Sequence, residues 1–123
     1  MLGRMRKVPG IKCNQKDIVL VPFPYSDLSS SKRRPVLVVS NDDYNRQFHD
    51  IVVCVITSNL RKDAYSIELN NDDLDVGILP ERSVVKAHKL FTIHQDKVLK
   101  KFSVVKSDLF SKVSKKIKHL ITE

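Results

Sequence analysis

The sequence has few of the residues from which several familiar kinds of site are built. Its three glycines, at positions 3, 10 and 77, are too far apart for a glycine-rich loop that cradles phosphate groups. Its two cysteines cannot form a disulfide framework or a four-cysteine zinc site, and this predicts a reducing, cytoplasmic location. The four histidines do not combine with cysteines or carboxylates at spacings typical of zinc sites. We therefore expect no cofactor and no metal.

Long hydrophobic runs are also absent. The best apolar run, residues 51–60, is far shorter than the roughly 18 residues of a membrane span. The basic N-terminus is followed by Val-Pro-Gly-Ile-Lys rather than by an apolar stretch, which is not the pattern of a secretory signal. With 41% hydrophobic and 29% charged residues, the 123-residue chain has the composition of one globular domain without a membrane partner.

Charge is abundant and unevenly distributed. The 22 Lys and Arg residues exceed the 14 Asp and Glu residues by eight. Residues 1–16 hold five bases and no acid, residues 63–81 hold six acids and no base, and residues 82–118 hold eleven bases against two acids. This asymmetry indicates one basic surface for a polyanion and one acidic edge, although lysines that merely keep a basic protein soluble would give a similar count.

The hydrophobic pattern predicts a run of strands followed by helix. Residues 1–16 read as a basic N-terminal tail, and residues 17–123 as one domain. Within the domain, residues 17–23 read as a strand buried on both sides, and a strand is expected at 35–40 with Pro35 first. The other strands are expected at 51–57, 65–69, 83–87 and 90–93, the last two forming one strand or two. Residues 41–45 read as a turn with at most one helical turn.

The rest of the chain reads as an acidic turn and a helical C-terminus. Residues 70–77 read as the turn, and the lysine-rich sequence after Ile93 has helical spacing. In the last segment Ser107 is the predicted N-cap. One apolar stripe there contains Phe110, Val113, Ile117, Leu120 and Ile121. The fold class is therefore a small, barrel-like α+β domain, mostly β.

Two arrangements of polar groups lie at the ends of hydrophobic strands. Arg34 stands between a basic loop and a strand, and Thr57 and Ser58 end another strand. If the two strands are neighbours, a guanidinium and hydroxyls meet at the sheet edge, which suits a phosphodiester because the planar guanidinium binds two phosphate oxygens. Two alternatives remain open: Arg34 forms an ion pair with Asp27 or another acid, and Thr57 caps its own turn.

These residues carry a resemblance that covers roughly residues 16–121. The segments Asp-Ile-Val-Leu-Val-Pro-Phe-Pro from Asp17, Arg-Arg-Pro-Val-Leu-Val-Val-Ser-Asn-Asp from Arg33 and Ile-Val-Val-Cys-Val-Ile-Thr-Ser from Ile51 are similar to the MazF/PemK family of toxins. The segment Ser-Val-Val-Lys-Ala-His-Lys-Leu-Phe-Thr-Ile from Ser83 resembles the last block of that family. The combination is fairly specific, although no part is diagnostic alone.

The resemblance implies a partly open, SH3-like β-barrel with a C-terminal helix that forms a homodimer. It implies an endoribonuclease that cuts single-stranded RNA at a short sequence without metal, through attack by the 2′-hydroxyl, and that a cognate antitoxin neutralises. By family role, Arg34 and Thr57 would hold the scissile phosphate and stabilise the phosphorane. The predicted RNA-binding residues are Tyr25, Lys32, Arg33, Ser58, Asn59, Arg61, Lys89 and Phe91.

The chain departs from the family where protons would be moved. In Kid-like members an Arg-x-Asp pair has that role, and the matching residues here are Lys86 and His88. Histidine titrates near neutrality, so His88 is the predicted general acid or base. The alternative is that His88 is a strand residue packed beside the site. Phe91 stands where those members have an arginine.

Two other functions remain open from the sequence. One is a catalytically weak toxin of the same fold that binds a protein target, as the related toxin CcdB does with gyrase. The other is a plain RNA-binding module. A CcdB-like function does not require Arg34 and Thr57 together beside a basic groove.

Overall fold

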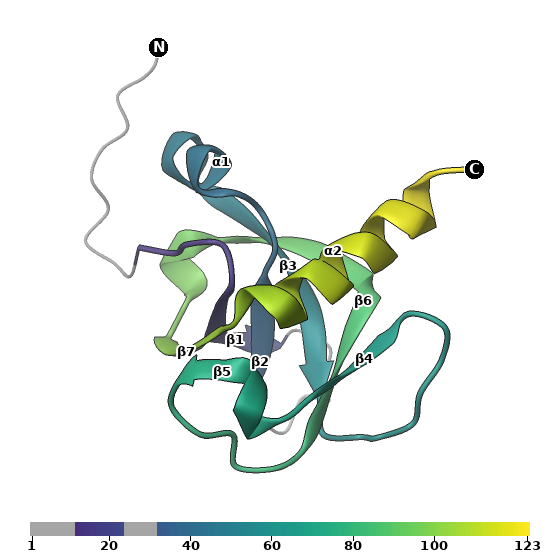
Figure 1. Cartoon of the computed structure of the whole chain (residues 1–123). Helices are drawn as coiled ribbons and strands as arrows, with labels where there is room; N and C mark the ends of the chain where they lie inside the picture. The colour runs from purple at the N-terminus through teal and green to yellow at the C-terminus, as the bar shows by residue number, and fades with distance from the viewer. Residues whose placement is uncertain (1–11, 24–31) are drawn as a thin grey trace.

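A computed structural model describes residues 12–23 and 32–123 of the chain. The described residues form seven strands and two α-helices (Figure 1). The strands are β1 (Asp17–Phe23), β2 (Lys32–Val38), β3 (Asp50–Thr57), β4 (Ser66–Leu69), β5 (Leu74–Val76), β6 (Ser83–His94) and β7 (Lys100–Val105). The helices are α1 (Asp42–Gln47), α2 (Ser107–Ile121) and the short 3₁₀ helices η1 (Asn71–Asp73) and η2 (Gln95–Lys97).

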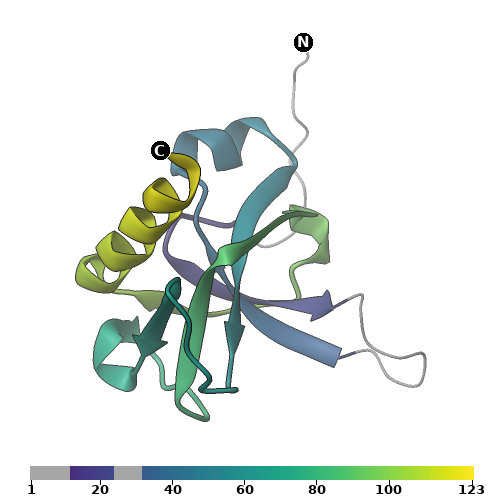
Figure 2. The same cartoon turned by 90° about the vertical axis from the view of Figure 1, so that its right-hand side faces the viewer.

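The strands form one antiparallel sheet in the order β4-β6-β3-β2-β1-β7-β5. Seen from the side, the sheet curls into a half-barrel with α2, drawn in yellow, on one flank (Figure 2). Helix α2 packs against β6 and β4. The sheet places β2 beside β3, so the strands that carry Arg34 and Thr57 are neighbours, which is the condition for a shared site at the sheet edge. The predicted fold class is confirmed.

Alternating side chains fill two hydrophobic clusters on opposite faces of the sheet. One contains Ile18, Leu37 and Ile56 together with Leu109 and Val113 of α2. The other contains residues of intervening positions on the same strands: Val19, Val21, Val36, Val38, Ile51 and Val53. Because successive residues point to opposite faces, a strand needs apolar residues at every position to fill both clusters. The prediction of burial on both sides is confirmed for Ile18, Val19 and Val21, which are 0% exposed.

Both cysteines lie in this interior, one in each cluster. Cys13 and Cys54 are 1% and 0% exposed. Burial raises the pKa of the Cys54 thiol to about 12. It also raises that of Cys13 to about 11, with a further contribution from the carboxylate of Asp17. The end of the predicted tail, residues 12–16, therefore packs on the domain, and the Lys16 N–H donates to the Val38 carbonyl at 3.0 Å.

Strand β6 is one strand with a bulge where the polar segment interrupts its pattern. Cys54 of β3 is opposite Leu90, and the next residue, Val55, is opposite Lys86. Ala87, His88 and Lys89 therefore have no partner on β3 and bulge out of the ladder. The Ala87 N–H donates instead to the Tyr65 carbonyl at 3.0 Å. The sequence left open whether the segments 83–87 and 90–93 form one strand or two. They form one strand, which continues on both sides of the bulge.

The structure corrects the prediction for the segment after Ile93. Residues 100–105 form β7 rather than helix and pair with β1 and β5. The alternation of buried Ser103 and Val105 with more exposed neighbours follows a strand period, which the surrounding lysines hide. The predicted acidic turn likewise contains η1 and the edge strand β5. Segments β5 and β7 are strands because they pair with strands that are distant in the sequence, and the local sequence pattern does not identify these partners.

Three boundaries also differ from the predictions. Helix α2 has Lys106 rather than Ser107 as its N-cap, since the Lys106 carbonyl accepts the Phe110 N–H at 3.1 Å. The Ser107 hydroxyl accepts a hydrogen bond from Lys16 Nζ at 2.8 Å. Residues 42–47 form α1 where a turn was predicted, with the Asn41 side chain as its cap. Strand β2 begins at Lys32, so Pro35 lies inside it, opposite Leu20 of β1.

Candidate functional site

The proline inside β2 marks the end of pairing between β2 and β3. The ladder between them runs from Val38 opposite Val53 to Val36 opposite Val55. Pro35 has no N–H to extend it. Beyond this point a cleft of about 470 Å³ opens at the end of the two strands. Its lining residues are Leu20, Arg33, Arg34, Pro35, Ile56, Thr57, Ser58, Leu79, Pro80, Glu81, Ser83 and Phe102.

Arg34 and Thr57 are held at this cleft by regular strand pairing. Arg34 is opposite Val21 of β1, and Thr57 is opposite Val84 of β6. Arg34 and Thr57 are not paired with each other, but counting two residues on from the last pair of β2 and β3 places them at corresponding positions on the same face. The cleft is therefore lined by a guanidinium and a hydroxyl whose backbones are held by β1 and β6, with Ser58 next to Thr57.

The hydroxyl of Thr57 also caps its own turn, which was the alternative left open by the sequence. Its Oγ1 accepts the Asn59 N–H at 3.1 Å. A hydroxyl carries one hydrogen in addition to its two acceptor positions. The hydrogen bond from Asn59 orients the oxygen and leaves the O–H to donate to a ligand. Capping and ligand binding are therefore compatible at Thr57.

A carboxylate that the sequence analysis missed lines the same cleft. Glu81 lies on the connection between β5 and β6. It lines the cleft together with Arg33, Arg34, Thr57 and Ser58. It is exposed, as is Arg33, so its carboxylate is accessible to a ligand. The sequence placed Glu81 at the end of an acidic run and gave no sign that this connection reaches the end of β2. An acceptor and a set of donors thus face one cavity.

Lys86 serves a different part of the structure from the cleft. Its side-chain nitrogen donates to the Arg61 carbonyl at 2.8 Å, to Ser66 Oγ at 3.0 Å and to Asp63 Oδ2 at 3.3 Å. The residue is 8% exposed, and it is not among the lining residues of the cleft. An ammonium group has three N–H donors, and these three acceptors can occupy all of them. Lys86 thereby ties the loop formed by residues 58–65 to β6.

His88 lies in the bulge and faces the same loop. Its Nε2 is 4.0 Å from Asp63 Oδ2, and its ring lies 5.7 Å from the ring of Tyr65. Its Nδ1 is buried and has no hydrogen-bond partner among the described residues. Like Lys86, His88 is absent from the cleft lining. The geometry thus brings Lys86 and His88 to Asp63 rather than to Arg34 and Thr57.

Asp63 is the charged partner that makes this arrangement possible. Hydrogen bonds from the Tyr65 N–H, at 2.8 Å, and from Ser66, together with Lys86, lower the pKa of its carboxyl to about 2. The carboxylate therefore remains ionised opposite the buried ammonium well below neutral pH. The acidic run seen in the sequence contains this residue, but its spacing does not identify Lys86 as the partner.

Two of the remaining predicted RNA-binding residues line the cleft, and the others lie elsewhere or outside the described residues. Arg33 and Ser58 line it, and Asn59 and Arg61 are exposed on the neighbouring loop. Lys89 is exposed in the β6 bulge. Phe91 is opposite Val53, where it packs against the second hydrophobic cluster. Lys32 opens β2, whereas Tyr25 and the predicted ion-pair partner Asp27 lie outside the described residues.

Two kinds of feature, a metal-binding group of side chains and a membrane-spanning helix, are absent from the described part of the chain. In residues 12–23 and 32–123, no three His, Cys, Asp or Glu side chains lie close enough together to hold a metal ion. In the same ranges, no helix is both long and apolar enough to cross a membrane. The expected absence of a cofactor, and the expected location, stay predictions.

Comparison with protein families places the chain. The family model described as "PemK-like, MazF-like toxin of type II toxin-antitoxin system" matches residues 14–121. The chain belongs to this family. No curated protein matches the chain by sequence.

Solved structures share the fold of this MazF-like toxin at low sequence identity. One is a MazE-MazF complex from Deinococcus radiodurans, with a TM-score of 0.74, 20% identity, and coverage of 90% of this chain and 96% of that one. Another is an endoribonuclease in complex with its cognate antitoxin from a mycobacterial species, with a TM-score of 0.72, 19% identity, and coverage of 87% and 92%. The toxin MazF-mt6 of Mycobacterium tuberculosis has a TM-score of 0.68, 18% identity, and coverage of 84% and 93%.

The contacts of Lys86 in this MazF-like toxin predict a structural role that can be measured. Lys86→Met keeps the length of the side chain but removes the side-chain donor to the Arg61 carbonyl and to the carboxylate of Asp63, whereas the Ser66 hydroxyl still accepts the Asp63 N–H. We expect the free energy of unfolding to fall by about 1–3 kcal/mol. Amide hydrogen exchange in residues 58–65 should become faster.

Lys89→Met, an exposed site in the same bulge, is the matched control and should change neither quantity. Equal effects of the two variants would contradict the anchoring role. A carboxyl with a lowered pKa stabilises the fold above its ordinary value of 3.8 and loses that effect toward pH 2. The difference between wild type and Lys86→Met should therefore be the same at pH 5 and pH 7.

Proposed function

We propose that this chain is a sequence-specific endoribonuclease toxin that cleaves single-stranded RNA and is neutralised by a cognate antitoxin. The observation that carries the proposal is the cleft that joins Arg34 to the hydroxyls of Thr57 and Ser58. Membership of the PemK/MazF-like family supports it, as does a net charge of +8, which suits a polyanionic substrate.

The cleft suits a phosphodiester whose charge grows during the reaction. In the proposed step the ribose 2′-oxygen attacks the adjacent phosphorus, and the bond from phosphorus to the 5′-oxygen of the next nucleotide breaks. The products are a 2′,3′-cyclic phosphate and a 5′-hydroxyl. Arg34 donates through its planar fork to the non-bridging oxygens, and Thr57 donates its free O–H. These donors are already in place, so they stabilise the phosphorane as it forms.

The reaction also requires a base for the 2′-hydroxyl and an acid for the leaving oxygen. Glu81 lines the cleft and is suited to accept the first proton, and solvent supplies the second proton to the leaving 5′-oxygen. His88, the group favoured by the sequence, has its Nε2 toward Asp63 in this structure. We infer that Glu81 is the base and that Lys86 and His88 act as positioning residues, through the loop that carries Ser58, Asn59 and Arg61.

The proposed partners follow from charge and from the family. Arg33, Arg34 and Arg61 surround the cleft and its neighbouring loop, which fits both RNA and an acidic antitoxin segment. Two of the similar structures contain an antitoxin with the toxin. We propose that the antitoxin competes with RNA for this surface.

Incubation of the purified protein with a long single-stranded RNA, followed by mapping of the new ends, tests the function. We expect cuts at one short sequence that leave a 2′,3′-cyclic phosphate, with the same rate in EDTA and in Mg²⁺. Loss of cutting in EDTA with recovery in Mg²⁺ would contradict metal independence. Intact RNA under every condition would favour the CcdB-like or RNA-binding alternative.

Arg34→Ala tests whether the guanidinium stabilises the transition state. We expect cleavage to slow by about 10²–10³, the usual cost of one such donor. Arg34→Lys should recover little of it because an ammonium lacks the planar fork. Arg46→Ala is the control, since Arg46 lies on α1 and pairs with Asp43 on the surface. A folded Arg34→Ala protein that cuts at the wild-type rate would remove Arg34 from the site.

Glu81→Gln and His88→Gln together identify the proton acceptor. We expect Glu81→Gln to slow cleavage by about 10²–10⁴ with nearly unchanged RNA affinity, and His88→Gln to have a smaller effect. The pH profile is an independent readout, because carboxylates ionise near pH 4 and imidazoles lose their proton near 6.5. If the cleavage rate of the wild type rises between about pH 5 and 7, and this rise is absent in His88→Gln, the base is His88 rather than Glu81.

The family resemblance predicts a homodimer, and two partly exposed hydrophobic residues support it. Phe91 and Ile93 pack against the second cluster but are themselves only partly buried, and two-fold pairing is the commonest form of self-association. Sedimentation at micromolar concentration should give a species of about twice 14.1 kDa. A monomer at that concentration would contradict the prediction.

A further inference from the structure

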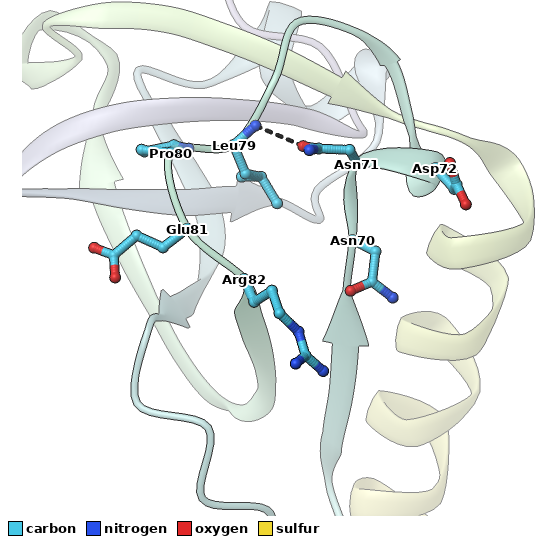
Figure 3. A pocket seen from close by; sticks show the side chains of 7 residues that line it. All are labelled: Asn70, Asn71, Asp72, Leu79, Pro80, Glu81 and Arg82. Carbon is cyan, nitrogen blue, oxygen red and sulfur yellow. Dashed lines mark hydrogen bonds between the residues drawn. The ribbon is translucent and has the colours of Figure 1, made fainter.

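A second pocket lies beside the proposed catalytic cleft. It has a volume of about 410 Å³ and lies between the end of β4 and the segment of residues 79–82 (Figure 3). This volume is within the range typical of pockets for small ligands. Asn70 and Asn71 stand on one side, and Leu79, Pro80 and Arg82 on the other. No role in the proposed reaction has yet been assigned to these side chains.

The two sides of this pocket are joined by a hydrogen bond. The Leu79 N–H donates to Asn71 Oδ1 at 2.8 Å, and Figure 3 shows this bond across the top of the pocket. The Asn70 N–H donates to Asp73 Oδ2 at 2.8 Å, which fixes the backbone at the end of β4. Leu79 is 6% exposed. The pocket therefore has a fixed apolar wall and a fixed amide, as a preformed site requires.

The polar groups of this pocket are available to a ligand. The Asn71 side chain accepts one hydrogen bond, and its NH₂ group donates none among the described residues. In the same part of the chain, the Arg82 guanidinium forms no hydrogen bond or ion pair. Arg82 extends toward Asn70 across the pocket, while Glu81 points to the other side of the segment (Figure 3). The carboxylates of Asp72 and Glu81 also line the pocket, so its walls offer both donors and acceptors, and a flat ring can lie against Pro80. The charge of Arg82 also helps to lower the pKa of Glu68.

The pocket and the catalytic cleft share one wall. Leu79, Pro80 and Glu81 line both of them. A strand of RNA whose phosphate lies at Arg34 and Thr57 would therefore have its next nucleotide at the ridge formed by residues 79–81. Beyond this ridge the base of that nucleotide would meet the guanidinium of Arg82 and the side-chain amides of Asn70 and Asn71.

We propose that this pocket is a subsite for a nucleobase that flanks the scissile phosphate, with guanine as its preferred base. The proposal rests on the proposed RNA cleavage, and it adds the residues that read the sequence. Arginine recognises guanine by donating two hydrogen bonds to O6 and N7, the commonest specific contact to a base. The apolar face of Pro80 and Leu79 covers the ring, and the amides of Asn70 and Asn71 contact its remaining edge.

The test compares cleavage-site preferences of the wild type and Arg82→Ala. Both are given a long RNA of mixed sequence, and the ends are mapped. We expect the wild type to prefer guanine at one position beside the cut, and Arg82→Ala to lose that preference by about tenfold or more. Sites without guanine should be cut at similar rates by both. Arg46→Ala is again the control and should keep the wild-type preference.

Binding of short DNA oligonucleotides, which lack the attacking 2′-hydroxyl, separates this proposal from the proposed function. We expect the wild type to bind an oligonucleotide with a single guanine more tightly than one with adenine there, and Arg82→Ala to bind both equally. Protein that cuts no RNA but retains this Arg82-dependent preference would keep the subsite and reject the nuclease. Cleavage with an unchanged preference in Arg82→Ala would reject the subsite alone.

Two further outcomes would also overturn the subsite. Equal loss of affinity for both oligonucleotides would make Arg82 a phosphate contact rather than a base reader. Weaker binding of an acidic peptide, with an unchanged base preference, would make the pocket a protein-binding site. Because Arg82 is exposed, its replacement should leave the fold intact in every measurement.

Discussion

The end of the ladder between β2 and β3 is the constraint on which the proposed site depends. Val36 opposite Val55 is the last pair, and the next residue on β2 is Pro35, which has no N–H to donate. Continued pairing would bring the strands together and close the space between them. Pairing of β2 with β1 continues past this point to Lys32, so Arg34 keeps a fixed backbone although its other neighbour has separated. A cleft and a rigid arginine thus have the same cause.

The second constraint is the burial of the positive charge of Lys86. Burial of an ammonium is costly unless acceptors and an opposite charge surround it, and Lys86 has a carbonyl, a hydroxyl and a carboxylate. All three acceptors come from the segment of residues 61–66. The same contacts that satisfy the charge therefore determine the path of the loop beside the cleft. Lys86, which the family resemblance predicts to take part in proton transfer, thus organises the backbone of this loop.

Much of the fold and half of the site could be predicted because the information was local. The continuous apolar runs identified β1 and β3, and the arginine before a proline and the hydroxyls after a strand located the cleft. The pairing that makes β7 a strand is not local, since β7 is held by β1, about eighty residues earlier. Glu81 and Arg82 were missed for the same reason: only the folded connection brings residues 79–82 to the end of β2. The bulge in β6 was visible only as a polar interruption.

The burial of both cysteines has a consequence for the chemistry of the surface. At neutral pH, pKa values of about 11 and 12 leave almost no thiolate, which is the form that oxidants and alkylating reagents attack. The two cysteines are all that the sequence contains. The folded protein therefore presents a surface that is nearly inert toward thiol reagents. A cysteine introduced on the loop of residues 58–65 would react alone, so a single spectroscopic label could follow that loop without the removal of a native residue.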